Sequence, residues 1–151
     1  RPAFLEDARE LYRAICDARV VAMLAAPPWP YRLADAEQFC GRAFDCRSPR
    51  FLITVPGEKG APIVGSVGLH DHGDGLELGY WIGSAHQGQG YASEALAGAV
   101  AAARMAAPRL SLFAECRDTN PASRRVLEKA GFRATGHAGA RAGMQRYQHA
   151  S

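Results

Sequence analysis

The chain has 151 residues, of which 48% are hydrophobic and 22% are charged, and its formal net charge is +3. This composition is typical of one globular domain that buries about two-thirds of its unfolded surface. The small net charge is spread along the chain and gives no nucleic-acid footprint. The longest apolar run, residues 95–103, is far shorter than the roughly 20 residues of a membrane span. We therefore expect a single domain over residues 1–151 that binds neither nucleic acid nor a membrane.

The chain begins at Arg1 and not at a methionine. We therefore expect leading residues that hold most of a first strand, with Arg1 and Pro2 as its end. No signal peptide is visible, which favours a cytoplasmic protein. The cysteines have no Cys-x-x-Cys spacing, and we interpret them as small buried or half-buried side chains in a reducing compartment.

Hydrophobic periodicity predicts the elements in chain order. Apolar side chains at helical spacing predict helices at residues 5–15 and 35–44, and the proline-rich segment 27–31 separates them as an extended loop. The rest of the chain predicts strands at 51–55, 63–69 and 76–82, a long helix from Gly90, a strand at 110–116, a helix from Asn120, and strands at 132–136 and 144–149. This order implies an α/β (α+β) fold with a mixed, mostly antiparallel sheet and helices on both of its faces.

The strand at residues 76–82 leads into a glycine-rich helix start, Gln87-Gly88-Gln89-Gly90. Backbone N–H groups at a helix start have no acceptor within the helix and carry about half a positive charge, and glycine leaves them uncovered. The segment therefore predicts a phosphate cradle. A nucleoside-triphosphate loop would need Gly-Lys-Ser/Thr at its end, and Ser93 stands where a dinucleotide fingerprint has its third glycine.

Two motifs resemble one enzyme family. Gln87, Gly90 and Ala92 fit the pattern Gln/Arg-x-x-Gly-x-Gly/Ala, which resembles the pyrophosphate loop of the GNAT superfamily of acyl-CoA N-acyltransferases. The segment from Asn120 to Phe132 resembles the GNAT segment Asn-x-x-Ser-(x)n-Lys-x-Gly-Phe. Together with Gly79-Tyr80-Trp81, these motifs are similar to the branch that contains the N-terminal alanine and serine acetyltransferases of ribosomal proteins. The resemblance implies the GNAT fold with a six- to seven-stranded sheet.

The resemblance also implies acetyl-CoA (coenzyme A) as the acyl donor. The residues that would bind it are Gln87, Gly88, Gln89, Gly90, Tyr91, Ala92, Asn120 and Ser123. The backbone of Trp81, Ile82 and Gly83 would pair with the pantetheine arm like an added strand. Many GNAT enzymes carry a tyrosine as general acid seven residues after the asparagine of the second motif, whereas this chain has Leu127 there. The ribosomal-protein branch uses the motif's serine, here Ser123, to hydrogen-bond the cofactor sulfur.

Acyl transfer to an amine requires the neutral amine. A lysine-type amine with a pKa near 10.4 is neutralised at pH 7 at a cost of roughly 4.6 kcal/mol, and an α-amine near 7.8 at about 1 kcal/mol. A general base therefore matters mainly for the lysine-type acceptor, and Glu77 is our candidate, acting through a water. Its alternative interpretation is a solvent-facing strand residue. Ser123 is the second catalytic candidate, with a first-turn helix residue as its alternative.

The acceptor is open between a protein N-terminus and a small-molecule amine. We expect its pocket between residues 27–31 and the segment after Gly136, with Trp29 and Tyr31 as walls or, alternatively, as packing anchors. His70 and His72 would share a strand face but lie at a turn without a third ligand, so we predict turn residues and no metal site. The oligomeric state is left open between a monomer and a homodimer.

Two rival functions remain. The first is a non-catalytic acyl-CoA-binding module, which Leu127 in place of tyrosine supports. The second is an NAD-type oxidoreductase, which would bind a nicotinamide. Our first hypothesis is an acetyl-CoA-dependent N-acetyltransferase in which the amine attacks directly in a ternary complex.

Overall fold

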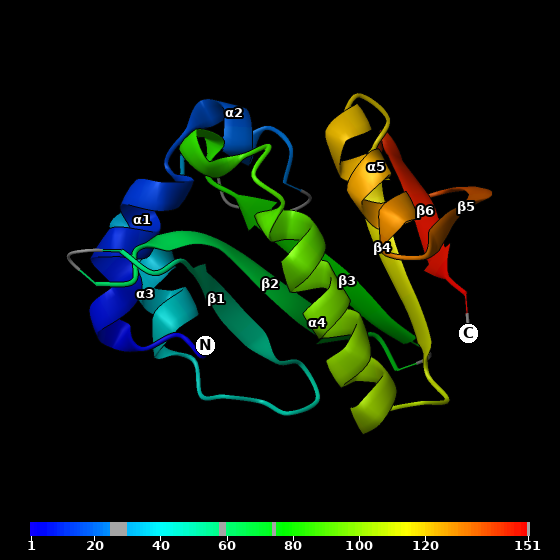
Figure 1. Cartoon of the computed structure of the whole chain (residues 1–151), viewed down its shortest axis with the longest axis horizontal. Coiled ribbons are helices and arrows are strands. Elements are labelled where there is room, and N and C mark those ends of the chain that lie inside the picture. Colours follow the sequence, from blue (N-terminus) through cyan, green and yellow to red (C-terminus); the bar gives the residue numbers. More distant parts are fainter. Residues whose placement is uncertain (25–29, 58–59, 74, 151) are drawn as a thin grey trace.

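The computed structural model describes residues 1–24, 30–57, 60–73 and 75–150. Figure 1 shows the elements, which in chain order are η1 (Leu5–Asp7), α1 (Ala8–Ile15), α2 (Ala18–Val21), α3 (Leu33–Gly41), β1 (Arg50–Thr54), β2 (Ile63–Asp71), β3 (Gly75–Ile82), η2 (Ser84–His86), α4 (Tyr91–Ala106), β4 (Ser111–Arg117), α5 (Pro121–Lys129), β5 (Phe132–Ala138) and β6 (Met144–His149). The predicted order of helices and strands is confirmed, and the short helices α2 and η2 are additions to it.

The helix predicted at residues 35–44 begins two residues earlier and ends three residues earlier, at Leu33–Gly41, so its predicted bounds were wrong. The carboxylate of Asp35 accepts the N–H of Arg32 at 2.7 Å, and this contact fixes the first turn before the apolar stripe begins. After Gly41 the chain turns to an extended conformation at Arg42. Glycine is a weak helix residue that commonly marks such an end.

The sheet has six strands in the order β1-β2-β3-β4-β6-β5. β3 and β4 are parallel, and the other neighbours are antiparallel, so the predicted mixed, mostly antiparallel sheet is confirmed. Pro2 forms an antiparallel bridge to Phe51, and the carbonyl of Arg1 accepts the N–H of Leu52 at 2.8 Å. Arg1 and Pro2 therefore lie along the edge of β1.

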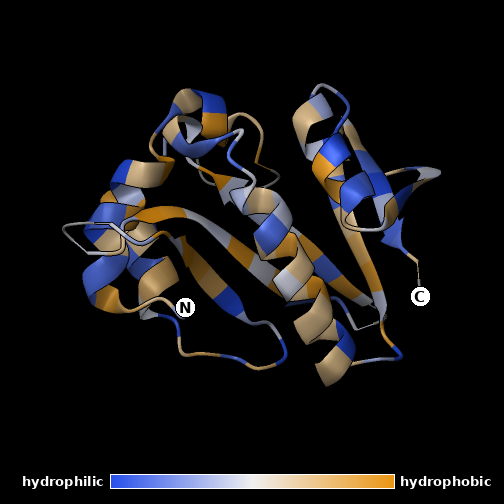
Figure 2. Cartoon of the chain, in the orientation of Figure 1, coloured by the Kyte–Doolittle hydropathy of each residue, from blue (hydrophilic) through white to orange (hydrophobic). Residues whose placement is uncertain are grey.

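Apolar side chains on the two faces of the sheet form two cores. On one face Leu76 and Leu78 of β3 pack with Leu96 of α4, which lies across β2 and β3. On the other face Leu11 of α1 packs with Leu52 of β1. Figure 2 shows the strands between these layers as largely hydrophobic. The period-2 pattern of residues 76–82 therefore predicted the faces of β3 correctly.

β3 and β4 part after a short paired segment. They are in register only from Gly75↔Ser111 to Glu77↔Phe113, whereas β3 stays paired with β2 as far as Ile82. The second half of β3 therefore presents an edge that β4 does not cover.

No helix within the described ranges is both long and apolar enough to span a membrane. The cysteines are all free. Cys40 and Cys116 are buried as expected, but Cys16 and Cys46 are exposed, because they follow the ends of α1 and α3 and lie outside both cores.

Candidate functional site

A cleft of about 1270 Å³ opens where β3 and β4 part. Its walls come from the second half of β3, the glycine loop and first turn of α4, β4, and the first turn of α5. Side chains of α1, α2 and α3 also line it. The cleft therefore joins three predicted parts of the site that lie far apart in the sequence: Glu77, the glycine loop and Ser123.

The geometry of the glycine loop suits an anion. Gly88 and Gly90 have φ angles of +76° and +88°, which side chains other than glycine rarely adopt. A Cβ atom on either residue would meet no atom within 4 Å, so the loop faces open space. The N–H of Glu94 bonds the carbonyl of Gly90 at 3.1 Å, and the amides ahead of it belong to the first turn, which has no acceptor inside the helix.

Gln87 anchors this loop to β3. Its side-chain amide donates to the carbonyl of Ile82 at 3.0 Å, and the amide of Gln89 reaches the carbonyl of Ala85 at 3.4 Å. The side chains of Gln87 and Gln89 therefore hold the loop in place. What these two residues can offer an anion is their backbone N–H groups.

The hydrogen bonds of β3 decide which peptide groups face the cleft. The N–H of Gly83 bonds Val64 at 2.8 Å, and the N–H of His72 bonds the carbonyl of Gly75 at 2.9 Å. Because bonded and non-bonded pairs alternate in an antiparallel ladder, the odd-numbered residues of β3 bond β2. The peptide groups of Leu78, Tyr80 and Ile82 point toward the gap.

This alternation corrects part of the predicted pantetheine contact. The peptide groups of Trp81 and Gly83 are turned toward β2, and the carbonyl of Gly83 also accepts the N–H of His86 at 2.9 Å. Of the three residues predicted to make backbone contacts, Ile82 alone has its peptide group toward the gap, as do Tyr80 and Leu78. The error arose because the sequence does not reveal the register between β2 and β3.

Ser123 lies at the start of α5, beside β3. Its N–H donates to the side-chain oxygen of Asn120 at 3.0 Å, so Asn120 is the N-cap of the helix. Its hydroxyl lies 2.8 Å from the phenolic oxygen of Tyr80. Both residues line the cleft, and burial raises the pKa of Tyr80 to about 12.

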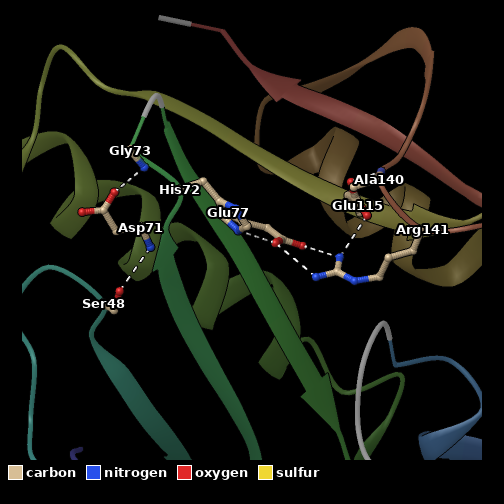
Figure 3. Close-up of polar contacts among 8 residues, drawn as sticks. All are labelled: Ser48, Asp71, His72, Gly73, Glu77, Glu115, Ala140 and Arg141. Atoms are coloured by element: carbon tan, nitrogen blue, oxygen red, sulfur yellow. Dashed lines mark hydrogen bonds and ion pairs between the residues drawn. The ribbon is translucent and has the colours of Figure 1, made fainter.

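Glu77 is buried, with 8% of its surface exposed, so its interpretation as a solvent-facing residue was wrong. Figure 3 shows its carboxylate pointing toward Arg141, which lies in the turn between β5 and β6. The guanidinium of Arg141 lies 2.9 Å from Glu77 and 2.9 Å from Glu115 of β4. The other oxygen of Glu77 lies 2.9 Å from Nε2 of His72.

These partners set the charge of Glu77. Burial raises its pKa, but the hydrogen bond and charge of Arg141 and the contact with His72 outweigh burial, so the pKa of Glu77 lies below its ordinary value. The hydrogen bond to Glu77 raises the pKa of Arg141 further above its ordinary value. Glu77 is therefore an ionised carboxylate in the cleft at neutral pH, able to accept a proton or to attract an ammonium group.

Of the two residues predicted to line the acceptor pocket, only Tyr31 is described by the structure. Trp29 lies outside the described residues. Tyr31 lines the cleft, and it is also a packing residue, 9% exposed and stacked on Tyr12 with ring centroids 6.4 Å apart. Both of its predicted roles are thus compatible with its position.

His72 is more than the turn residue that the sequence indicated, since it contacts Glu77, whereas His70 lies at the end of β2. Burial lowers the pKa of His70. In the described ranges, histidine, cysteine and acidic side chains form no group of three that could hold a metal ion.

Sequence reasoning missed Arg141, Glu115 and the contact of Tyr80. Nothing in the segment around Arg141 signals its partner, because the two acids lie on other strands. Tyr80 does carry a signal: a polar hydroxyl on the apolar face of a strand needs a hydrogen-bond partner in the core.

The cleft has two features that suit a long, anionic ligand with a peptide-like arm. A phosphate group needs exposed amides at a helix start, and the open loop at Gly88 and Gly90 presents them. A peptide-like arm needs free strand edges, and the second half of β3 presents one. Both features lie in one continuous cavity.

The chain matches the family described as "Acetyltransferase (GNAT) domain" over residues 1–133. No curated protein sequence matches it significantly.

Solved structures share its fold. An acetyltransferase (GNAT family) from Bacillus anthracis is 22% identical with a TM-score of 0.80, over 98% of this chain and 90% of that one. The microcin C7 self-immunity acetyltransferase MccE, in complex with acetyl-CoA and AMP, is 21% identical with a TM-score of 0.80, over 99% and 89%. A chimera of the spermidine N-acetyltransferase SpeG from Vibrio cholerae and hSSAT is 19% identical with a TM-score of 0.74, over 99% and 92%. These likenesses confirm the predicted fold.

Proposed function

We propose, from the premise that the chain belongs to the GNAT acetyltransferase family, that it transfers the acetyl group of acetyl-CoA to a primary amine in a ternary complex. The observation that carries this proposal is the continuous cleft that runs from the exposed amides of α4 to the gap between β3 and β4. The MccE structure, which holds acetyl-CoA, supports the choice of donor.

The chain would hold the donor at two places. The backbone of residues 87–92 would bind the pyrophosphate, where the helix start concentrates N–H groups and positive charge. The peptide group of Tyr80 and the N–H of Ile82, whose carbonyl already accepts Gln87, would pair with the pantetheine amides in the manner of an added strand. With the donor held in this way, its sulfur would lie near the first turn of α5.

Acetyl-CoA supplies an activated acetyl group. A bond forms between the amine nitrogen and the acetyl carbonyl carbon, and the bond between that carbon and the sulfur breaks. Glu77 receives the proton that the nitrogen loses, through a water. Ser123 donates a hydrogen bond to the sulfur, which keeps the electron pair of the broken bond as a thiolate. Because a thiol has a pKa near 8.5 by analogy with cysteine, the leaving group needs little protonation.

The acceptor is a protein N-terminus or a small-molecule amine. The resemblance of the second motif, with Ser123 and with Leu127 in place of tyrosine, to the branch of ribosomal-protein N-terminal acetyltransferases supports a protein N-terminus. Because a spermidine N-acetyltransferase chimera is among the similar structures, small polyamines are also acceptors to test.

A second candidate function is a non-catalytic acyl-CoA-binding module. One observation favours it: Leu127 is 1% exposed and lies in the core, so α5 offers no phenol at the position where many GNAT enzymes carry their general acid.

Release of CoA thiol from acetyl-CoA separates the two candidates. The acceptor panel would contain an α-amino peptide, a lysine-type amine, spermidine and an aminoglycoside. We expect acceptor-dependent thiol release that exceeds hydrolysis without acceptor. Tight binding of CoA in calorimetry without turnover of any acceptor would instead support the binding module, and failure to bind CoA would refute both.

A further inference from the structure

Tyr80 places a phenol beside Ser123 from a different element. Tyr80 lies on β3 and Ser123 on α5, 43 residues away, and their side-chain oxygens are 2.8 Å apart. The phenolic oxygen also lies 3.4 Å from the carbonyl of Ser123. Both residues line the cleft.

The hydroxyls of Tyr80 and Ser123 differ in their strength as hydrogen-bond donors. A phenol is the stronger acid and therefore the better donor, while a serine hydroxyl has one hydrogen and two acceptor positions. When Tyr80 donates to the oxygen of Ser123, the hydrogen of Ser123 is free for a group in the cleft. Hydrogen bonds in such a chain polarise one another and strengthen the final donor.

Other roles for Tyr80 explain less of the contact between its hydroxyl and Ser123. Core packing would require only the ring of Tyr80, which a phenylalanine would supply equally. Proton transfer from the phenol itself is opposed by its burial, which raises the pKa of Tyr80 to about 12. The neighbouring Cys116 is a buried thiol, and burial raises its pKa as well, so it offers no competing anion.

We propose that Tyr80 is a positioning residue that acts through Ser123: it orients and polarises the serine hydroxyl toward the sulfur of coenzyme A. The inference rests on the proposed acetyl-CoA site. The phenol that this chain lacks at Leu127 on α5 is thereby supplied from β3, one hydrogen bond further from the sulfur.

Binding of CoA and of desulfo-CoA, in which hydrogen replaces the thiol group, tests this role. Calorimetry at about pH 9, where much of the free thiol is ionised, gives the ratio of the two dissociation constants. We expect the wild type to prefer CoA, because a thiolate accepts a strong hydrogen bond. Tyr80→Phe should reduce this preference several-fold and Ser123→Ala by about tenfold, both through weaker binding of CoA with desulfo-CoA unchanged.

The double variant decides whether Tyr80 acts through Ser123. In the Ser123→Ala background, Tyr80→Phe should leave the preference unchanged. An equal further loss there would show that the phenol contacts the sulfur directly, and an unchanged preference in the single variant would leave Tyr80 without a role toward the sulfur. Either result overturns the proposal.

Two controls keep the outcomes distinct. Tyr147→Phe removes the hydroxyl of a buried tyrosine that packs in the core and does not line the cleft, and it should not change the preference. If the wild type binds CoA and desulfo-CoA equally, the sulfur contact fails while the cofactor site stands. If it binds neither, the proposed function itself fails.

Discussion

Glu77 keeps its charge inside the protein because cationic and polar partners surround it. Arg141 and His72 bind its two oxygens, and Arg141 also binds Glu115. A carboxylate held in this way is ionised at neutral pH but is a weaker base than a free one. Its proton affinity therefore suits an acceptor that is already partly neutral better than a lysine-type amine.

Glu77→Gln tests the proposed role of Glu77 as the general base. The amide cannot take a proton, so we expect kcat with a lysine-type amine to fall by about 10²-fold or more, and kcat with an α-amine to fall less. The rate of thiol release with each acceptor measures both effects. Unchanged turnover of the lysine-type amine would refute the assignment.

Arg141→Met should change the pH profile. Without the guanidinium, burial raises the pKa of Glu77 with less opposition, so the acidic limb of kcat/KM should move to higher pH. The matched control is Arg9→Met, which removes an exposed arginine of α1 and should leave the limb in place. If the acidic limb of kcat/KM does not move in Arg141→Met, Glu77 does not determine the pH profile.

The same substitution should lower stability in a pH-dependent manner. The lowered pKa of Glu77 contributes stability that is fully present above the ordinary carboxyl pKa and is lost as pH falls through the lowered value. Since the side chain of Arg141 is 35% exposed, solvent weakens the pair, and we expect a loss of roughly 1–2 kcal/mol. Urea unfolding at about pH 7 should show the full difference from wild type and at about pH 3 a smaller one.

At the scale of elements, the starts of two helices build the site. Asn120 caps α5 through the N–H of Ser123 and so fixes the serine relative to β3. Gly90, in the left-handed conformation, is the N-cap of α4. In both cases the residue that caps the helix also fixes the position of groups proposed to bind the ligand. Its substitution should therefore change stability and ligand binding together.

Asn120→Ala should destabilise the protein by about 1 kcal/mol, because the first turn of α5 loses its acceptor. Asn120→Asp keeps an oxygen at the same place and should keep most of the stability. Urea unfolding measures both. Equal stability of the alanine variant and the wild type would show that the cap does not hold α5.

Gly90→Ala should weaken CoA binding in addition to costing roughly 1–2 kcal/mol for a left-handed alanine. The added Cβ would enter open space in the cradle. Gly98→Ala is the matched control within α4: it is an exposed helical position with nothing within 4 Å of the new Cβ. It should raise stability by about 0.5–1 kcal/mol and leave CoA affinity unchanged in calorimetry. Equal affinities of the two variants would exclude the cradle.

At the scale of the whole molecule, the cleft joins the two halves of the sheet. β1, β2 and β3 form one half, and β4, β6 and β5 form the other, with three paired positions between β3 and β4. A ligand that occupies the gap would bind both halves. It should therefore stabilise the fold as one unit.

CoA at about 100 times its dissociation constant should add about 2.7 kcal/mol to the free energy of unfolding. For a chain of this size the melting temperature should rise by about 5–10 °C. Pantetheine, which lacks the pyrophosphate, should give a much smaller shift at the same concentration. Equal shifts in a thermal melt would show that the start of α4 does not bind phosphate.

The sequence by itself determined what depends on neighbours in the chain. Alternation gave the faces of β3, capping residues gave the starts of α4 and α5, and the two motifs led to the family. These features arise from backbone geometry within a few residues, so a single sequence contains them.

Only the tertiary structure decided the contacts between distant segments. Arg141 meets Glu77 across 64 residues, and Tyr80 meets Ser123 across 43. The register between β2 and β3 decided that the peptide group of Ile82, and not that of Trp81 or Gly83, points toward the gap. The physical reason is that strand pairing and side-chain packing are fixed by the whole core, whose free energy no local pattern records.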